Sequence, residues 1–181
     1  RLIVSGLKKL TPAITIVAEE KMAGGDSPDI DAGEFWLVDP LDGTREFISR
    51  NGEFTVNIAL VRDGVPILGV VYLPANAQLY AGAASLGAFI IEKNVPRHAI
   101  QARAPSDDGL LVVASRSHMN DETKALIADL NVTGFKSAGS SLKFCLVAAG
   151  EADYYPRLGR TMEWDTAAGH AVLASAGGRV T

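Results

Sequence analysis

The chain has 181 residues, of which 48% are hydrophobic, and this length and composition predict one substantial hydrophobic core rather than a disordered chain. Its 17 Lys and Arg residues against 21 Asp and Glu give a formal net charge of −4, which argues against a nucleic-acid polymer as a partner but still allows a small phosphorylated ligand held by a few placed cations. Cys145 is the only cysteine, so no internal disulfide can form, and we expect a reducing compartment, with the cytoplasm as the default.

The first half of the chain predicts one helix followed by β-structure. Residues 2–10 carry apolar side chains at helical spacing, and residues 14–17 have the pattern of a short strand that leads to Glu19. Residues 21–34 are rich in Gly, Asp, Ser and Pro and predict a surface loop, whereas the continuous apolar run at residues 35–38 predicts a strand buried on both faces. Alternating apolar residues then predict an antiparallel meander, with strands at residues 55–61, 67–73, 78–81 and 88–91.

The second half predicts alternating strands and helices. A polar stretch at residues 101–109 could divide the chain into two subdomains, residues 1–100 and 101–181, but both halves supply candidate site residues. We therefore treat residues 1–181 as a single unit. The predicted elements are strands at residues 110–114, around Phe135 and at 152–155, and helices at residues 120–130, 142–149 and 166–175.

The segment Asp39-Pro40-Leu41-Asp42-Gly43-Thr44 places two carboxylates three residues apart at the end of a buried strand. Pro40 should stop ladder pairing, Gly43 allows backbone conformations that other residues resist, and Thr44 is expected to cap a short helix at residues 46–48. A turn here would direct both carboxylates to one side and let the N–H groups of Gly43 and Thr44 face an anion. Metal and phosphate would then meet at one point; the alternative is an ordinary turn with an aspartate as its capping residue.

Two further acidic positions complete a candidate metal site. Asp165 lies in Trp164-Asp165-Thr166-Ala167-Ala168-Gly169, at the start of a helix rich in small residues, where the alternative role is an N-cap. Glu19 follows the first strand, where a solvated surface acid is the alternative. Together with Asp39 and Asp42 they form an all-oxygen ligand set, which suits Mg²⁺ or Mn²⁺ rather than zinc.

These three segments occur in the order found in a known family. Asp-Pro-Leu-Asp-Gly-Thr, an upstream Glu-Glu pair and a downstream Trp-Asp-x-Ala-Ala-Gly resemble the lithium-sensitive, magnesium-dependent phosphatases of the inositol-monophosphatase-like superfamily, and the resemblance covers nearly the whole chain. It implies that Glu19, Asp39, Asp42 and Asp165 are metal ligands, joined by the backbone carbonyl of Leu41. It also implies inhibition by Li⁺.

The resemblance further implies a mechanism without a covalent enzyme intermediate. Two or three Mg²⁺ ions would hold the phosphate, activate a water for in-line attack and stabilise the leaving oxygen, with Mn²⁺ as a possible substitute. Glu19, Asp42 and Thr44 would have the catalytic roles, and Thr44 would help to orient the water. The residues expected to contact the substrate are Glu19, Leu41, Asp42, Gly43, Thr44, Ser140, Lys143, Arg157 and Asp165.

Within this family, residues 139–144, 154–157, 51–57 and 115–118 resemble the CysQ-type 3′(2′),5′-bisphosphate nucleotidases, which remove the 3′-phosphate of adenosine 3′,5′-bisphosphate. A second phosphate requires further donors, and Lys143, Arg157 and the hydroxyl of Ser140 could supply them. The alternatives are an exposed helix cation for Lys143 and a simple cap for Ser140.

The family resemblance implies a layered α/β fold with the order α/β/α/β/α. Family members usually begin before the position of Arg1 and continue beyond that of Thr181, so we expect this chain to be truncated at both ends. No apolar run approaches the length of a membrane span, although some bacterial relatives associate peripherally with the inner membrane. The oligomeric state is left open.

Three other functions stay open at this stage. An inositol monophosphatase would need polyol-binding groups where Lys143 and Arg157 occur. A haloacid-dehalogenase-type phosphatase also uses an Asp-Gly-Thr strand end, but with one residue between its aspartates, whereas Pro40 and Leu41 intervene here. The third is a truncated metal-binding or phosphate-binding remnant that is not an enzyme.

Overall fold

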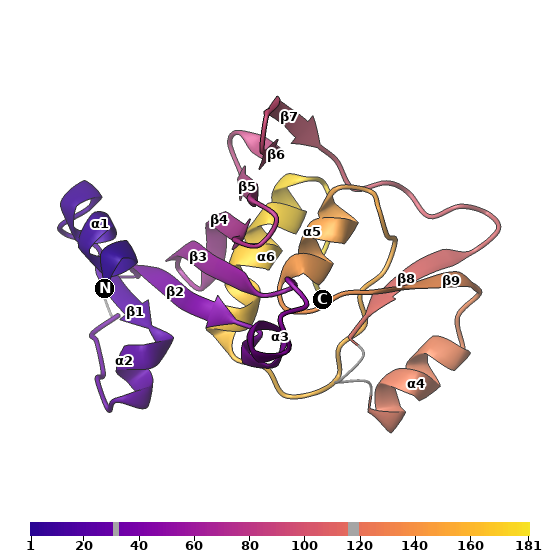
Figure 1. Ribbon diagram of the computed structural model, residues 1–181, viewed down its shortest axis with the longest axis horizontal. Helices are drawn as coiled ribbons and strands as arrows, with labels where there is room; N and C mark the ends of the chain where they lie inside the picture. The colour runs from indigo at the N-terminus through magenta and orange to yellow at the C-terminus, as the bar shows by residue number, and fades with distance from the viewer. Residues whose placement is uncertain (31–32, 116–119) are drawn as a thin grey trace.

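The computed structural model describes residues 1–30, 33–115 and 120–181, and Figure 1 shows helices and two sheets stacked in alternation. The order from the N-terminal side is α1, a large sheet, the pair α5 and α6, a small sheet and α4. The predicted layered α/β fold is therefore confirmed. Among the described residues, no helix has the length and apolar character needed to cross a bilayer.

The large sheet contains seven strands in sequence order. Its first pair is parallel and every later pair is antiparallel, so the predicted meander is confirmed and extended by one strand at its far edge. The strands are β1 (Thr15–Ala18), β2 (Glu34–Asp42), β3 (Thr55–Arg62), β4 (Val65–Leu73), β5 (Gln78–Ala83), β6 (Gly87–Glu92) and β7 (Val95–Ile100).

Both faces of the large sheet are covered at strand β2. Trp36 and Val38 of β2 pack with Leu7 of α1 (Leu2–Leu10), while Leu37 points the other way, into the main core that includes residues of α5 and α6. The prediction that this strand is buried on both faces is thus confirmed. Helix α6 (Glu163–Ser175) lies very close to the sheet, because β4 presents Gly69 there: a Cβ at Gly69 would lie 2.2 Å from the Ala168 carbonyl oxygen.

The small sheet pairs β8 (Leu110–Ala114) with β9 (Val132–Ser137) in parallel. Helix α5 (Leu142–Ala148) lies between the two sheets and contributes to the hydrophobic clusters on both sides. Helix α4 (Asp121–Ala128) flanks the small sheet and begins at Asn120, whose side chain accepts a hydrogen bond from the Thr123 N–H.

Several predictions of secondary structure are wrong. Strand β2 continues through Pro40 and pairs again at Asp42, although Pro40 was expected to stop ladder pairing. Residues 21–23 belong to a short helix, α2 (Glu19–Ala23), instead of the predicted loop, and α6 begins at Glu163 rather than at residue 166. Residues 152–155 make only an isolated parallel bridge between Val112 and Tyr154 instead of a strand. There, the Asp153 carboxylate rather than a backbone carbonyl accepts the N–H of Leu111, which interrupts regular ladder pairing.

Candidate active site

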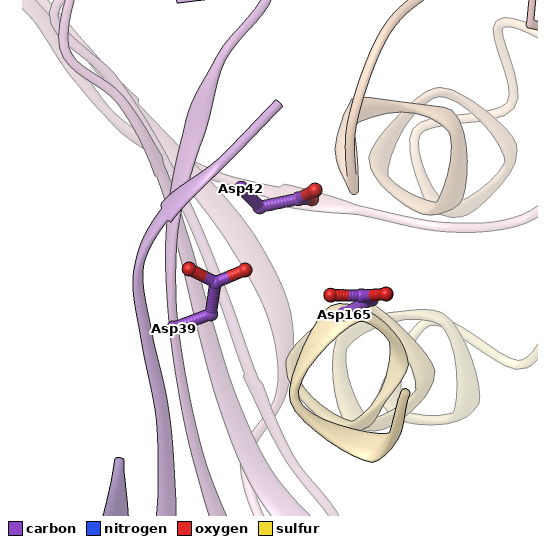
Figure 2. Close-up of side chains that lie close together, drawn as sticks. All are labelled: Asp39, Asp42 and Asp165. Atoms are coloured by element: carbon purple, nitrogen blue, oxygen red, sulfur yellow. The ribbon is translucent and has the colours of Figure 1, made fainter. Parts of the chain in front are cut away.

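Three carboxylates from distant parts of the chain converge at the end of β2. Asp39 and Asp42 belong to β2 and Asp165 to the first turn of α6, and each offers an oxygen within 4.8 Å of those offered by the other two. Figure 2 shows the three side chains directed into the same space. The structure therefore brings together three of the four carboxylates that the sequence predicts for a metal site.

A β-bulge explains why Asp39 and Asp42 face the same side. In a regular strand, residues three apart point to opposite faces. Here Asp39 pairs with Asn57 and Asp42 with Thr55, so three steps along β2 match two steps along β3. The extra residue restores a common direction, and the Leu41 N–H donates to Oδ1 of Asp39 over 2.9 Å within the bulge.

The Asp42 carboxylate is held in place by donors from β3 and from the residues before α5. Its Oδ2 accepts hydrogen bonds from Thr55 Oγ1 (3.2 Å), Asn57 Nδ2 (3.2 Å), and the Ser141 N–H (2.8 Å) and Oγ (3.0 Å). The hydrogen bonds that the described residues make to this carboxylate all go to Oδ2, and none of them goes to Oδ1.

Thr55, Asn57 and Ser141 received no role from the sequence, although one signal was present. Thr55 and Asn57 occupy inward-facing positions of an alternating strand, and both are at most 1% exposed. A polar residue on the apolar face of a strand requires a buried hydrogen-bond partner, and that partner is Asp42.

The carboxylates repel one another when no cation is present. Burial raises the pKa of Asp39 to about 8, and the carboxylates of Asp42 and Glu19 act in the same direction. Burial and the nearby Asp165 carboxylate also raise the pKa of Asp42. A divalent cation would relieve this repulsion, and buried carboxylate oxygens are the donors that Mg²⁺ prefers, so the cluster fits the expected metal.

Asp165 occupies the third position of α6, where the sequence alternative had been an N-cap. The N-cap is Met162, and Asp165 Oδ2 accepts hydrogen bonds from the Met162 N–H (3.1 Å) and from Thr161 Oγ1 (3.0 Å). Helix α6 extends one turn further toward its N-terminus than predicted, which moves Asp165 inside the helix. The capping contacts fix the orientation of the side chain beside β2.

Glu19 lies next to the three-carboxylate cluster. It is the first residue of α2 and follows β1, whose last residue, Ala18, pairs with Val38 of β2. Parallel pairing therefore places Glu19 beside Asp39, where its carboxylate helps to raise the pKa of Asp39. The structure thus brings the fourth predicted carboxylate to the edge of the cluster.

A cavity of about 250 Å³ opens beside the carboxylates. Its lining contains the carboxylates Asp42 and Asp165 together with the cations Lys143 and Arg157. Of the nine predicted substrate contacts, seven line this cavity: Asp42, Gly43, Thr44, Ser140, Lys143, Arg157 and Asp165. Ser115, from the predicted segment 115–118, also lines the cavity. Residues 116–118 of that segment lie outside the described residues.

Gly43 allows the chain to turn tightly into α3 (Thr44–Ser49). Its φ of 89° is in the left-handed region, and a Cβ there would lie 2.0 Å from Ser140 Oγ, which donates to the Asp42 carbonyl oxygen. The prediction that Thr44 caps this helix is wrong, because the N-cap is Gly43 and Thr44 is the first helical residue. The Thr44 side chain is thereby left to line the cavity.

Lys143 is buried, which contradicts the alternative of an exposed helix cation. The residue is 2% exposed, and its Nζ donates to the Ser140 carbonyl oxygen over 2.6 Å and lies 5.2 Å from the ring centre of Tyr155. Burial lowers the pKa of Lys143 to about 8, although the nearby Asp42 carboxylate opposes the shift. A buried cation in a cavity wall is a strong site for an anionic group.

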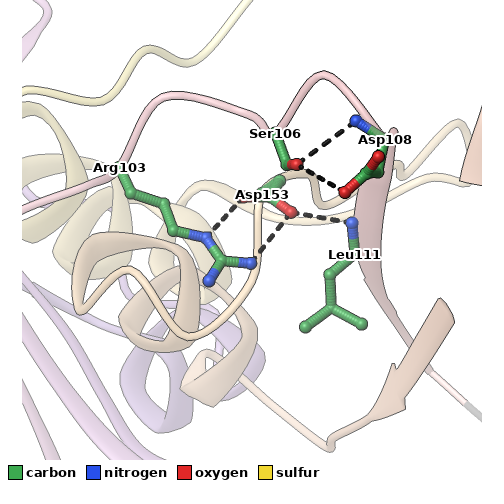
Figure 3. Close-up of polar contacts among 5 residues, drawn as sticks. All are labelled: Arg103, Ser106, Asp108, Leu111 and Asp153. Atoms are coloured by element: carbon green, nitrogen blue, oxygen red, sulfur yellow. Dashed lines mark hydrogen bonds and ion pairs between the residues drawn. The ribbon is translucent and has the colours of Figure 1, made fainter. Parts of the chain in front are cut away.

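Arg157 lies on an irregular segment that is fastened to the small sheet. Four residues earlier, Asp153 accepts hydrogen bonds from Arg103 Nε (2.7 Å), Arg103 Nη2 (3.0 Å) and the Leu111 N–H (2.7 Å), as Figure 3 shows. The Asp153 side chain is only 2% exposed. We call these bonds from Arg103 and Leu111 to Asp153 the Asp153 clasp. They hold the start of the segment on which Tyr155 and Arg157 line the cavity.

Comparisons with known proteins identify relatives that are similar over most of this chain. The 3′(2′),5′-bisphosphate nucleotidase CysQ of Escherichia coli K12 is 51% identical over 178 residues, which are 98% of this chain and 70% of that protein. The structure of CysQ from Bacteroides thetaiotaomicron superimposes with a TM-score of 0.78 at 42% identity and covers 91% of this chain and 67% of that one.

A structure of inositol monophosphatase from Anabaena (Nostoc) sp. PCC 7120 superimposes with a TM-score of 0.80 at 30% identity, over 97% of this chain and 69% of that one. The sequence profile of the inositol monophosphatase family matches residues 1–181. The chain therefore belongs to the inositol monophosphatase family.

Proposed function

We propose that this protein is a magnesium-dependent phosphomonoesterase that removes the 3′-phosphate of adenosine 3′,5′-bisphosphate and releases AMP and phosphate. The observation that carries the proposal is the cavity that joins a carboxylate cluster to two cations, Lys143 and Arg157. A site for one phosphate at the carboxylate end and for another at the cationic wall suits a substrate with two phosphates. The 51% identity to a protein named bisphosphate nucleotidase supports the same substrate class.

The carboxylate end is assigned to the reacting phosphate. Glu19, Asp39, Asp42 and Asp165 would hold two or three Mg²⁺ ions, together with the backbone carbonyl of Leu41. Bound Mg²⁺ would neutralise phosphate charge and make a water nucleophilic near neutral pH.

The residues around that end have distinct roles in the proposal. The Thr44 hydroxyl orients the attacking water, since its side chain opens into the cavity beside Asp42. Glu19, next to Asp39, accepts a proton from that water. Glycine at position 43 allows the left-handed turn and leaves room for the Ser140 and Glu46 side chains beside it.

The cationic wall is assigned to the second phosphate. Lys143 and Arg157 supply the charge. The Ser140 hydroxyl lines the same cavity and donates to the Asp42 carbonyl oxygen. Tyr155 covers Lys143 with its ring and so keeps the cation out of bulk water, which strengthens its attraction for an anion.

A second candidate is inositol 1-phosphate hydrolysis, which the similarity to the inositol monophosphatase from Anabaena favours. The test measures Mg²⁺-dependent phosphate release from adenosine 3′,5′-bisphosphate and inositol 1-phosphate side by side, with and without Li⁺. We expect a kcat/KM at least about a hundredfold higher for the nucleotide, because a hydrogen bond to a charged group is worth roughly 1.5–3 kcal/mol and the inositol ester has no second phosphate to bind Lys143 and Arg157. A preference for the inositol ester would overturn the substrate assignment, and Mg²⁺ binding without turnover of either ester would favour a non-enzymatic remnant.

A further inference from the structure

Glu46 places a buried carboxylate in the wall of the cavity, and the function proposed above gives it no role. The residue is 9% exposed, lies in the first turn of α3 and lines the cavity together with Thr44 and Lys143. In the parts of the chain that the structure describes, no side chain or backbone N–H donates a hydrogen bond to its carboxylate. The Glu46 carboxylate oxygens are not among the fully enclosed atoms of the described residues, so they are open to the cavity, where a ligand donor can reach them.

The position of the carboxylate is fixed by its neighbours. A Cβ on Gly43 would lie 3.1 Å from Glu46 Oε2, and a Cβ on Gly139 would lie 2.6 Å from Glu46 Cγ. The aliphatic part of the side chain therefore packs over Gly139, and the carboxylate lies beside the turn that faces the reacting phosphate. This places an acceptor beside Gly43, in the part of the cavity that is assigned above to the reacting phosphate.

The charge of Glu46 also limits what it can face. A carboxylate accepts hydrogen bonds but does not donate them, so it repels a phosphate and attracts a hydroxyl or an amine. The Coulomb interaction with Lys143 is favourable, but the two groups form no ion pair within 4.0 Å in the described structure. A substrate donor next to the scissile phosphate is the partner that satisfies both the charge and the position.

We propose that Glu46 is a specificity-determining residue that accepts a hydrogen bond from the substrate hydroxyl adjacent to the scissile phosphate. In a nucleoside 3′,5′-bisphosphate that group is the 2′-hydroxyl of the ribose. This inference rests on the proposed function, since it takes the reacting phosphate to be the 3′-phosphate. It adds a selection for ribonucleotides over 2′-deoxyribonucleotides that neither the metal site nor the cationic wall provides.

The test compares kcat/KM for adenosine 3′,5′-bisphosphate and for its 2′-deoxy analogue, in the wild type, Glu46→Gln and Glu46→Ala. We expect the wild type to prefer the ribonucleotide by about tenfold to a hundredfold, which is the range for losing a hydrogen bond to a charged group. The preference should fall to about threefold in Glu46→Gln, whose amide oxygen is a weaker acceptor, and disappear in Glu46→Ala.

Glu53→Gln is the matched control, because Glu53 also acts electrostatically on Lys143 but is absent from the described lining of the cavity. Glu53→Gln should keep the wild-type preference for the ribonucleotide. If Glu46→Gln and Glu53→Gln lose this preference equally, the cause is a general charge effect on Lys143 and the proposal is overturned. Equal hydrolysis of both nucleotides by the wild type would overturn the role of Glu46 alone. Hydrolysis of neither would overturn the proposed function and this inference with it. Melting temperatures of the variants identify any that fail to fold.

Discussion

The two ends of the cavity are built in different ways. At the carboxylate end, Asp42 lies on a strand of the large sheet and its Oδ2 receives hydrogen bonds from three residues on two other segments. Arg157, which also lines the cavity, lies on an irregular segment, and its Nη2 donates to the Arg160 carbonyl oxygen over 3.3 Å. One end is thus fixed by a sheet and by buried polar contacts, and the other by a short segment fastened at Asp153.

This difference indicates how a single fold could keep one reaction and change its substrate. The carboxylate end requires a bulge, a sheet register and a helix start to agree, so a change in any of them would disturb the metal ligands. The cationic wall can change through single side chains on α5 and on residues 154–157 without altering the sheet. We therefore expect variants at the two ends to affect kcat and KM differently.

The largest expected effect is at the carboxylate end. Asp42→Asn removes a proposed metal ligand and should lower kcat by about 10³-fold or more, since metal stabilisation of transition-state charge is worth several kcal/mol. The measurement is steady-state phosphate release at saturating Mg²⁺, with the exposed variant Asp107→Asn as the control. Turnover within about twofold of the wild type in Asp42→Asn would contradict the metal assignment.

Metal removal should reveal the repulsion among the carboxylates. Mg²⁺ at about 100 times its Kd should stabilise the protein by roughly 2.7 kcal/mol, which corresponds to an increase of about 5–10 °C in melting temperature for a chain of this size. Thermal unfolding with Mg²⁺ and with EDTA measures the shift. In Asp165→Asn the shift should shrink to about 2 °C or less, and identical melting temperatures for the wild type in both buffers would disprove metal binding at this cluster.

Lys143→Met should act on the second phosphate. We expect KM for adenosine 3′,5′-bisphosphate to rise by about 10- to 100-fold and KM for adenosine 3′-monophosphate to change by less than about threefold. Lys124→Met, on an exposed helix, is the control. A parallel rise for both substrates would show that Lys143 supports the fold of the cavity rather than the second phosphate.

Lys143 should also make the KM for the bisphosphate depend on pH. Because burial lowers the pKa of Lys143 to about 8, the side chain is cationic below that pH and loses its charge above it. The KM for the bisphosphate should therefore increase as the pH rises through 8 in the wild type, and this increase should be missing from Lys143→Met. The same profile for the 3′-monophosphate serves as the reference.

The smallest expected effect is on the clasp that holds the cationic wall. Arg103→Ala removes both bonds from the half-exposed Arg103 to Asp153 and should raise KM for the bisphosphate about threefold with kcat unchanged, since a solvent-screened ion pair contributes little. Lys136→Ala, which breaks the exposed ion pair with Glu151, should leave KM unchanged. A fall in kcat for Arg103→Ala would show that the two ends of the cavity are not independent.

The sequence predicted the elements of the fold whose signals are local. The meander followed from alternating apolar residues, and α5 and α6 from small and apolar residues at helical spacing. The prediction failed at residues 152–155, because the acceptor for the Leu111 N–H is a side chain, and no pattern within that segment distinguishes this arrangement from a strand. It also placed the start of α6 one turn too late, since Met162 is not a typical N-cap residue.

For the candidate site, the sequence by itself determined which carboxylates to examine and which metals suit them. The turn chemistry of Asp39 to Thr44 and the acidic helix start at Asp165 are visible in short windows. Only the tertiary structure decided that Lys143 is buried and that Glu46 faces the cavity. It also decided that Asp42 is held by donors 13 to 99 residues away along the chain, because such contacts depend on sheet register and helix packing, which no local pattern encodes.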